Sequence, residues 1–146
     1  MRRRHNDPRK PDRVLEHMRL MEYMPEYQRP EEDRLYRAAY EHLGGINCAT
    51  CAISELEKRP SRVTKRAVKV HYGIIASANS VMKNAEERDK YAQGPDLSVL
   101  CFEMEAAGLM NNFPCLVIRG ICDYSDSHKN DEWHRYAALT AAAYLC

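Results

Sequence analysis

The sequence lacks both a long apolar run and a strong net charge. No apolar stretch approaches the roughly 18 residues needed to span a bilayer, and the N-terminal MRRRHNDPRK has no apolar segment of the kind that a secretory signal requires. The formal net charge is only +1 at pH 7, so no bulk electrostatic field favours nucleic acid or an acidic membrane as a partner. We therefore expect a cytoplasmic protein that binds neither nucleic acid nor membranes.

Cysteine is too scarce and too scattered for a disulfide scaffold. The 146 residues include six cysteines, and two of them, Cys101 and Cys115, lie within apolar runs that predict buried strands. Reduced thiols are therefore expected. With 45% hydrophobic and 29% charged residues and no internal repeat, the chain has the composition and length of one globular domain with its own core.

The N-terminal part of the chain divides into a tail and two expected helices. Residues 1–13 are rich in arginine, contain two prolines and have almost no apolar side chain to pack, which predicts a disordered basic tail. The domain would then occupy residues 14–146. Apolar residues at steps of three and four predict an amphipathic helix over 14–24 that Pro25 stops. Helix-forming residues favour a second helix over 31–43.

Cys48 and Cys51 have the spacing of one half of a zinc site. The other half is not apparent, because the sequence has no second CxxC and no HxxxH pair. The motif also follows a Gly-Gly loop and does not open a helix packed on a clear strand. We therefore expect no bound metal, and a small zinc-binding interaction domain stays open as an alternative.

The segment around this motif, residues 44–67, is dense in charge and is broken by Pro60. These features predict an exposed insertion loop. A phosphate-binding role is the alternative for its basic side chains. These side chains are Arg59, Arg62, Lys65 and Arg66.

Two short apolar runs, 99–102 and 115–118, each end on acidic residues. The intervening residues 106–112 suit about two helical turns, and Pro114 then prevents the helix from continuing. The unit therefore predicts a strand, a helix and a parallel strand. A third strand is predicted over 68–77, where β-branched and aromatic residues precede polar ones. Further helices are expected at 81–91 and 132–145.

Ligands bind open parallel sheets at the carboxyl ends of the strands. That edge would bring Glu103, Glu105 and Asp123 around one cleft. Alternatives for these acids stay open, because a helix N-terminus favours glutamates and because Asp123 and Asp126 could form turns. Arg119 could be a solvated strand end or the partner of a glutamate.

The segment FEMEAAGLM, followed by VIRGICDYSD, resembles the signature half of the purine nucleoside phosphorylase and nucleosidase superfamily, which includes enzymes that cleave methylthioadenosine and S-adenosylhomocysteine. Together with HYGIIASANSVMK and YAALTAAAY, it is more similar still to nucleoside-phosphorylase-like domains of fungal multidomain proteins with NACHT or ankyrin-repeat modules. The resemblance implies an α/β fold, a three-layer sandwich around a mixed, partly barrel-like sheet. It also implies an incomplete half domain.

The half that the resemblance leaves out is the N-terminal one, which would carry the phosphate-binding or water-activating residues. A missing N-terminal half is therefore an expected partner of this chain. Without it, strand edges would stay uncovered, and such edges recruit other chains. We accordingly expect a tendency to form a homo-oligomer.

Carried over by position, the resemblance makes Asp123 the acid that protonates the departing purine, aided by Cys122. It makes Glu105 the acceptor of hydrogen bonds from the ribose 2′- and 3′-hydroxyls, and Met104 the surface that packs on the ribose. The other corresponding positions are Glu103 and Arg119 as supporting groups, Val81 and Met82 in the base pocket, and Ser77 in the loop before them.

The chemistry of N-glycosidic cleavage suits these residue types. Breaking the bond leaves an electron-poor sugar and an electron-rich base, so a carboxylate near the sugar and a proton donor near the base lower the barrier. Asp123 must be protonated when it acts, which requires a raised pKa. The expected function is cleavage of purine nucleosides or nucleotides, by phosphorolysis or hydrolysis, with no cofactor and with phosphate as a potential co-substrate. A nucleoside- or nucleotide-binding module without turnover is the alternative.

Overall fold

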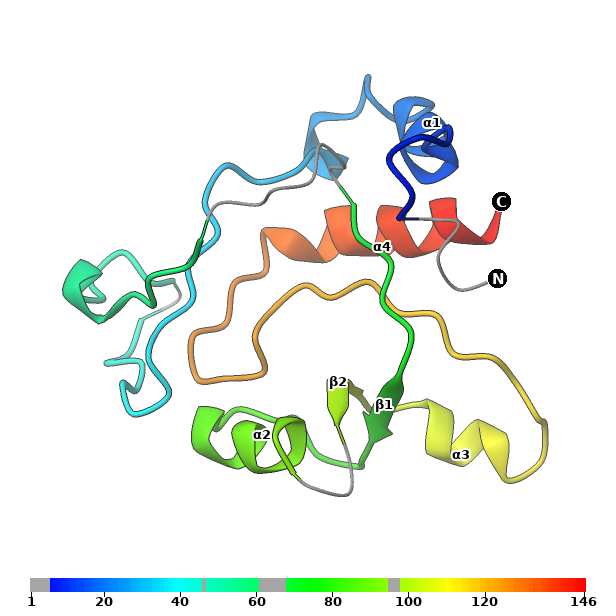
Figure 1. Ribbon diagram of the computed structural model, residues 1–146. Coiled ribbons are helices and arrows are strands. Elements are labelled where there is room, and N and C mark those ends of the chain that lie inside the picture. The colour runs from blue at the N-terminus through cyan, green and yellow to red at the C-terminus, as the bar shows by residue number, and fades with distance from the viewer. Residues whose placement is uncertain (1–5, 46, 61–67, 95–97) are drawn as a thin grey trace.

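The computed structural model describes residues 6–45, 47–60, 68–94 and 98–146. Figure 1 shows two groups of elements, with α1 beside α4 in one and the strands with α2 and α3 in the other. Long loops join the two groups. In chain order the elements are α1 (Arg13–Arg19), η1 (Pro25–Tyr27), η2 (Ile53–Glu55), β1 (Ile74–Ser77), α2 (Ala85–Ala92), β2 (Val99–Glu103), α3 (Ala106–Met110) and α4 (Trp133–Leu145).

β1 and β2 form a two-stranded parallel sheet. Their register places Ser77 opposite Glu103, so two polar residues meet at the carboxyl ends of the strands. The connection runs through α2, which packs on β2, with the Tyr91 ring 6.0 Å from that of Phe102. Two of the three expected strands are therefore confirmed, although the first is shorter than predicted. The three-layer sandwich stays a prediction.

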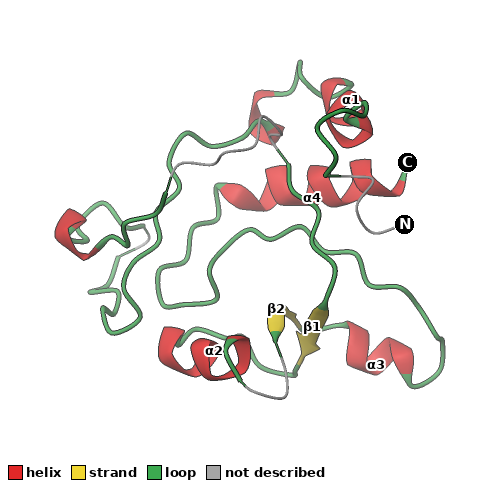
Figure 2. Cartoon of the chain, in the orientation of Figure 1, coloured by secondary structure: helices red, strands yellow, loops and turns green. Residues whose placement is uncertain are grey.

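The predicted strand over 115–118 is wrong. Figure 2 draws the chain after α3 as a loop, and this loop passes between α4 and the strands. Leu116 is 84% exposed, whereas a parallel strand is stable only where both of its faces are covered. The loop instead approaches α4 at Gly120. A Cβ added to Gly120 would lie 1.9 Å from the carbonyl oxygen of Ala137, which is in α4.

α1 packs on α4 and forms the main apolar cluster. Val14 and Met18 of α1 are buried against Ala143 of α4. The side chain of Asp12 caps α1, and its Oδ1 atom accepts from the Leu15 amide at 3.1 Å. The helix is shorter than the predicted 14–24, and turns lead from its end to η1.

Part of the predicted disordered tail is ordered. The side chain of Asn6 donates to the Val70 carbonyl at 2.6 Å and accepts from the Val70 amide at 3.0 Å. Arg9 forms an ion pair with Asp7 at 2.9 Å. Residues 1–5 lie outside the described residues.

The helix predicted over 31–43 is also wrong, because this segment is extended. Tyr36, which is 2% exposed, forms an antiparallel bridge with Leu56. The Glu57 amide donates to the Leu35 carbonyl at 2.8 Å. These hydrogen bonds between two segments of the chain replace the local hydrogen bonds of a helix. The described part of the predicted insertion loop over 44–67 is mostly exposed, as expected, and the pairing at Leu56 and Glu57 joins it to residues 35–36.

Arg59, the described member of the proposed phosphate-binding group, is already engaged within the protein. Its guanidinium lies 3.3 Å from the Asp33 carboxylate and 5.5 Å from the centre of the Tyr124 ring. The Tyr124 hydroxyl donates to the same carboxylate at 2.6 Å. The other members, Arg62, Lys65 and Arg66, lie outside the described residues.

Within the four described ranges, no helix combines the length and the apolar character needed to cross a membrane.

Candidate functional site

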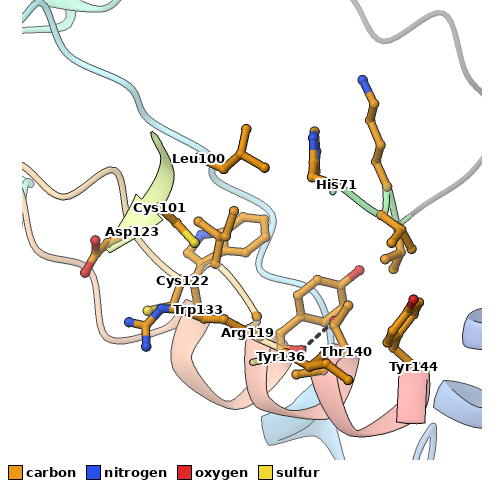
Figure 3. Close-up of a pocket in the computed structure, with 18 of the residues that line it drawn as sticks. His71, Leu100, Cys101, Arg119, Cys122, Asp123, Trp133, Tyr136, Thr140 and Tyr144 are labelled. Carbon is orange, nitrogen blue, oxygen red and sulfur yellow. Dashed lines mark hydrogen bonds between the residues drawn. The ribbon is translucent and has the colours of Figure 1, made fainter. Parts of the chain in front are cut away.

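A cavity of about 630 Å³ lies between α4 and the loop before it. Its walls also include the segment before β1 and the start of β2. In Figure 3, Trp133, Tyr136 and Thr140 come from α4, and Cys122 and Asp123 come from the loop on the other side. Apolar and aromatic side chains form most of the lining, and charged and polar side chains form the rest; small-molecule sites use such polar groups to orient a ligand.

Asp123 is held by two partners at the edge of this cavity. Its Oδ1 atom accepts from the Ser125 amide at 2.8 Å, and its Oδ2 atom forms an ion pair with Lys129 Nζ at 2.7 Å. Ser125 has a φ of 54°, which lets the chain turn tightly enough to return Lys129 to the carboxylate. Each oxygen of the Asp123 carboxylate therefore has a partner, either a hydrogen bond or an ion pair.

The pKa of Asp123 is lowered, and the expectation of a raised pKa is wrong. Burial raises the pKa, but the hydrogen bonds from Lys129 and from the Ser125 amide together lower it further than burial raises it. The carboxylate is thus ionised at neutral pH. It is a hydrogen-bond acceptor in the ground state and needs a proton before it can act as an acid.

Replacement of Lys129 should change how stability depends on pH. Asp123 has a folded pKa below its ordinary value of 3.8, so it contributes stability that is present above that value and is lost as the pH falls through the folded pKa. Lys129→Met removes the largest influence that lowers this pKa, so the pKa of Asp123 should rise. We expect a loss of about 1 kcal/mol at neutral pH, after allowance for solvent screening, that shrinks below about pH 4.

Urea unfolding of wild type and Lys129→Met across this pH range measures the effect. Lys90→Met is the matched control, because Lys90 is an exposed lysine on α2. An equal loss of stability at every pH would show that Lys129 does not act through the charge of Asp123.

Cys122 and Arg119 also line the cavity. Burial, and then the charge of Asp123, raises the pKa of the Cys122 thiol. Cys122 is therefore protonated and can donate a weak hydrogen bond beside the acid. The charge of Arg119 lowers the pKa of both Cys122 and Glu103. Arg119 therefore acts electrostatically on the cavity wall and on the end of β2.

Glu103 and Ser77 form a separate cluster at the carboxyl ends of the strands. Glu103 is 6% exposed, and its Oε2 atom accepts from the amides of Glu105 at 2.9 Å and Ala106 at 2.8 Å. Ser77 Oγ accepts from the Ala107 amide at 3.0 Å. Burial raises the pKa of Glu103, but these amides and the Ser77 hydroxyl bring it below its ordinary value. Glu103 thus satisfies the first amides of α3, as the helix N-terminus alternative proposed.

The remaining predicted residues lie away from the cavity. Met104 is 42% exposed and Val81 is 50% exposed. Glu105 is exposed, and its Oε2 atom accepts from the Met104 amide at 3.1 Å. Met82 is half-buried, but it does not line the cavity.

The single cleft predicted around Glu103, Glu105 and Asp123 is therefore not formed: Asp123 lines the cavity, and the two glutamates do not. The physical reason is the missing strand over 115–118. That strand would have carried Asp123 to the same sheet edge as the glutamates.

Sequence reasoning missed Lys129 and the aromatic wall of α4. Lys129 follows Asp123 through a turn that no periodic pattern marks. The Trp133 and Tyr136 rings meet edge to face at 5.7 Å, and both line the cavity. The sequence does contain a signal for this aromatic wall, because aromatic residues one turn apart in a helix lie on the same face. Sequence reasoning also missed that Cys122, Asp123 and His134 bring their ligand atoms within 4.8 Å of one another, although Asp123 is already paired with Lys129.

Comparison with known proteins finds similarity to part of one much longer protein. Over 73 residues, 50% of the chain, it is 60% identical to a nucleotide-binding leucine-rich repeat (NLR)-like protein of Hyaloscypha variabilis. The match spans 7% of that protein, so the chain corresponds to a small part of its length. No family model and no solved structure matches the chain. The similarity to an NLR-like protein agrees with the expected link to proteins that contain NACHT modules.

Proposed function

We propose that this chain is part of a nucleoside-phosphorylase-like module that cleaves the N-glycosidic bond of purine nucleosides or nucleotides. The observation that carries the proposal is the wall of the cavity, which Asp123, Cys122 and Arg119 line together with the aromatic side chains of Trp133 and Tyr136. A volume of about 630 Å³ suits a ligand of this size. The similarity to an NLR-like protein supports a place within a larger protein.

In this proposal, the aromatic side chains hold the base and the polar wall promotes its departure. Trp133 and Tyr136 offer apolar faces to a purine ring. As the bond breaks, electrons accumulate on the base, and Asp123 delivers a proton to it. Because Lys129 and the Ser125 amide hold Asp123 ionised in the ground state, Asp123 must take up a proton from solvent before it passes that proton to the purine.

Glu105 does not line the cavity, so other residues would bind the ribose hydroxyls. The acceptor, phosphate or water, would be bound by another segment or by a second copy of the chain. The proposed fold of the whole module remains the three-layer sandwich.

The second candidate function is purine nucleoside or nucleotide binding without turnover. The ion pair between Asp123 and Lys129 favours it, because an ionised carboxylate accepts a hydrogen bond from a base but has no proton to give. Such a module would serve as a sensor or an interaction domain. The same cavity would hold the ligand in both cases.

Chromatographic measurement of free purine distinguishes the two functions. The protein is incubated with adenosine, methylthioadenosine, S-adenosylhomocysteine or ATP, each with and without phosphate. We expect release of the base, and a dependence on phosphate would identify phosphorolysis. Binding detected by calorimetry without release would support the binding module. If the protein neither bound nor cleaved any of these compounds, both proposed functions would be overturned.

A further inference from the structure

His42 lies beside the thiols of Cys48 and Cys51. The ligand atoms of these three residues all lie within 4.8 Å of one another. Cys51 is 7% exposed, and the other two residues are half-buried. The donor that the CxxC motif lacked in the sequence is therefore supplied by a histidine that precedes the Gly-Gly turn.

The backbone between these residues is shaped for this approach. Gly44 and Gly45 have φ values of 102° and 99°, in the region that favours glycine. The Cys51 amide donates to the Cys48 carbonyl at 3.2 Å, which closes the turn between the two thiols. Arg34 Nη1 donates to the same carbonyl at 3.1 Å. Backbone hydrogen bonds thus hold both cysteines in place and do not involve their thiols.

The imidazole of His42 is oriented by its neighbours. Its Nε2 atom lies 3.0 Å from the Asn47 carbonyl oxygen, which accepts a hydrogen placed on Nε2 and leaves the lone pair on Nδ1. Its backbone amide donates to Ser127 Oγ at 3.0 Å. Metal-binding histidines commonly donate their second ring nitrogen to a backbone carbonyl, which fixes the tautomer and the ring orientation.

A second histidine, His128, lies beside His42 but outside the group of three whose ligand atoms are within 4.8 Å of one another, and it has a buried nitrogen without a hydrogen bond. The His128 ring meets the His42 ring edge to face, with centroids 5.6 Å apart, and stacks on Tyr36 at 4.2 Å. The His128 side chain is 3% exposed, and its Nε2 atom is buried without a hydrogen bond. Its Nδ1 atom lies 3.9 Å from Asp126 Oδ2. An unpaired buried nitrogen is costly, and a carboxylate behind a histidine is a common second contact at zinc sites.

We propose that His42, Cys48, Cys51 and His128 bind one zinc ion. Two thiolates and two imidazoles form a common tetrahedral zinc set, and soft thiolates select zinc over the harder divalent cations. The ion would join the turn at 42–51 to the loop at 126–128, two segments far apart in the sequence. The proposal does not depend on purine cleavage.

A redox role for the same thiols fits less well. Redox-active CxxC motifs open a helix, whose N-terminus lowers the pKa of the thiol. Residues 48–51 form a turn without a helix. The geometry therefore suits a structural ion better than disulfide exchange.

Metal analysis of the purified chain and cobalt substitution test the site. We expect one zinc per chain by mass spectrometry, and a cobalt form with thiolate charge-transfer bands and the visible spectrum of tetrahedral coordination. Cys48→Ser should abolish the charge-transfer intensity of one thiolate, and His128→Asn should weaken cobalt binding about 10-fold or more. Cys115→Ser is the matched control, because Cys115 is an exposed cysteine in a loop, and it should bind as wild type does.

Cobalt titration of the wild-type chain keeps the test independent of whether a variant folds. The absence of thiolate bands in the wild type would overturn the site. Equal losses in Cys48→Ser and Cys115→Ser would also overturn it. Unchanged cobalt affinity in a folded His128→Asn variant would overturn the four-residue ligand set.

Discussion

In a preparation that releases purine, Asp123→Asn should lower kcat by about 10²- to 10⁴-fold and change KM little. The amide keeps the size of the side chain and can still contact the Ser125 amide and Lys129. It has no proton to transfer, so the loss falls on the step in which the base departs. Initial rates of purine release over a range of substrate concentrations separate kcat from KM.

Asp131→Asn is the matched control for this prediction. Asp131 lies in the same loop, and its side chain is 88% exposed. It should leave both constants unchanged. A raised KM with an unchanged kcat in Asp123→Asn would mean that Asp123 only binds the substrate, and the binding-module function would then be favoured.

Gly120→Ala should destabilise the fold by about 3 kcal/mol or more, at the upper end of the cost of overpacking. An added Cβ would lie 1.9 Å from the carbonyl oxygen of Ala137 and 2.5 Å from its carbonyl carbon. These are backbone atoms of α4, so no rotation of a side chain relieves the contact. The loop that carries Cys122 and Asp123 would have to move away from α4. Urea unfolding measures the difference in free energy.

Gly108→Ala is the opposite case and serves as the control. Gly108 lies in α3, and nothing lies within 4 Å of the position that its Cβ would occupy. Alanine is favoured over glycine in a helix by about 0.5–1 kcal/mol, so this variant should be slightly more stable than wild type. Similar stabilities of the two variants would contradict the close approach of the loop to α4.

Local signals in the sequence predicted the elements that local interactions stabilise. α2 was expected over 81–91, and it begins after Asn84, whose Oδ1 atom caps it by accepting from the Glu87 amide at 2.9 Å. α4 was expected over 132–145 and spans Trp133–Leu145. Capping side chains and helix-forming residues lie within these segments, so their sequence contains the information that defines them.

Elements that depend on distant partners were predicted poorly. The segment over 31–43 has helical propensity, but the pairing of Tyr36 with Leu56 outweighs it. The run over 115–118 has the composition of a strand, but it is a loop and is not part of the sheet that β1 and β2 form. In both cases tertiary contacts decide the conformation, and no local pattern contains them.

The candidate site shows the same division. Arg119, Cys122 and Asp123 were found together because they are close in the sequence, and all line the cavity. The pairing of Lys129 with Asp123 and the approach of His128 to His42 depend on turns and on contacts between distant loops. Those contacts lower the pKa of Asp123, which reverses one expectation, and bring a second histidine beside His42.

The central claim is that the cavity beside Asp123 binds a purine nucleoside, and amide chemical shifts test it most directly. Adenosine is titrated into isotope-labelled protein and the backbone amide spectrum is recorded. We predict saturable shifts at Cys122, Ser125 and the Trp133 indole, with no change at Glu87 on α2 outside the cavity. An unchanged spectrum at Cys122, Ser125 and Trp133, or equal shifts at Glu87, would contradict the claim.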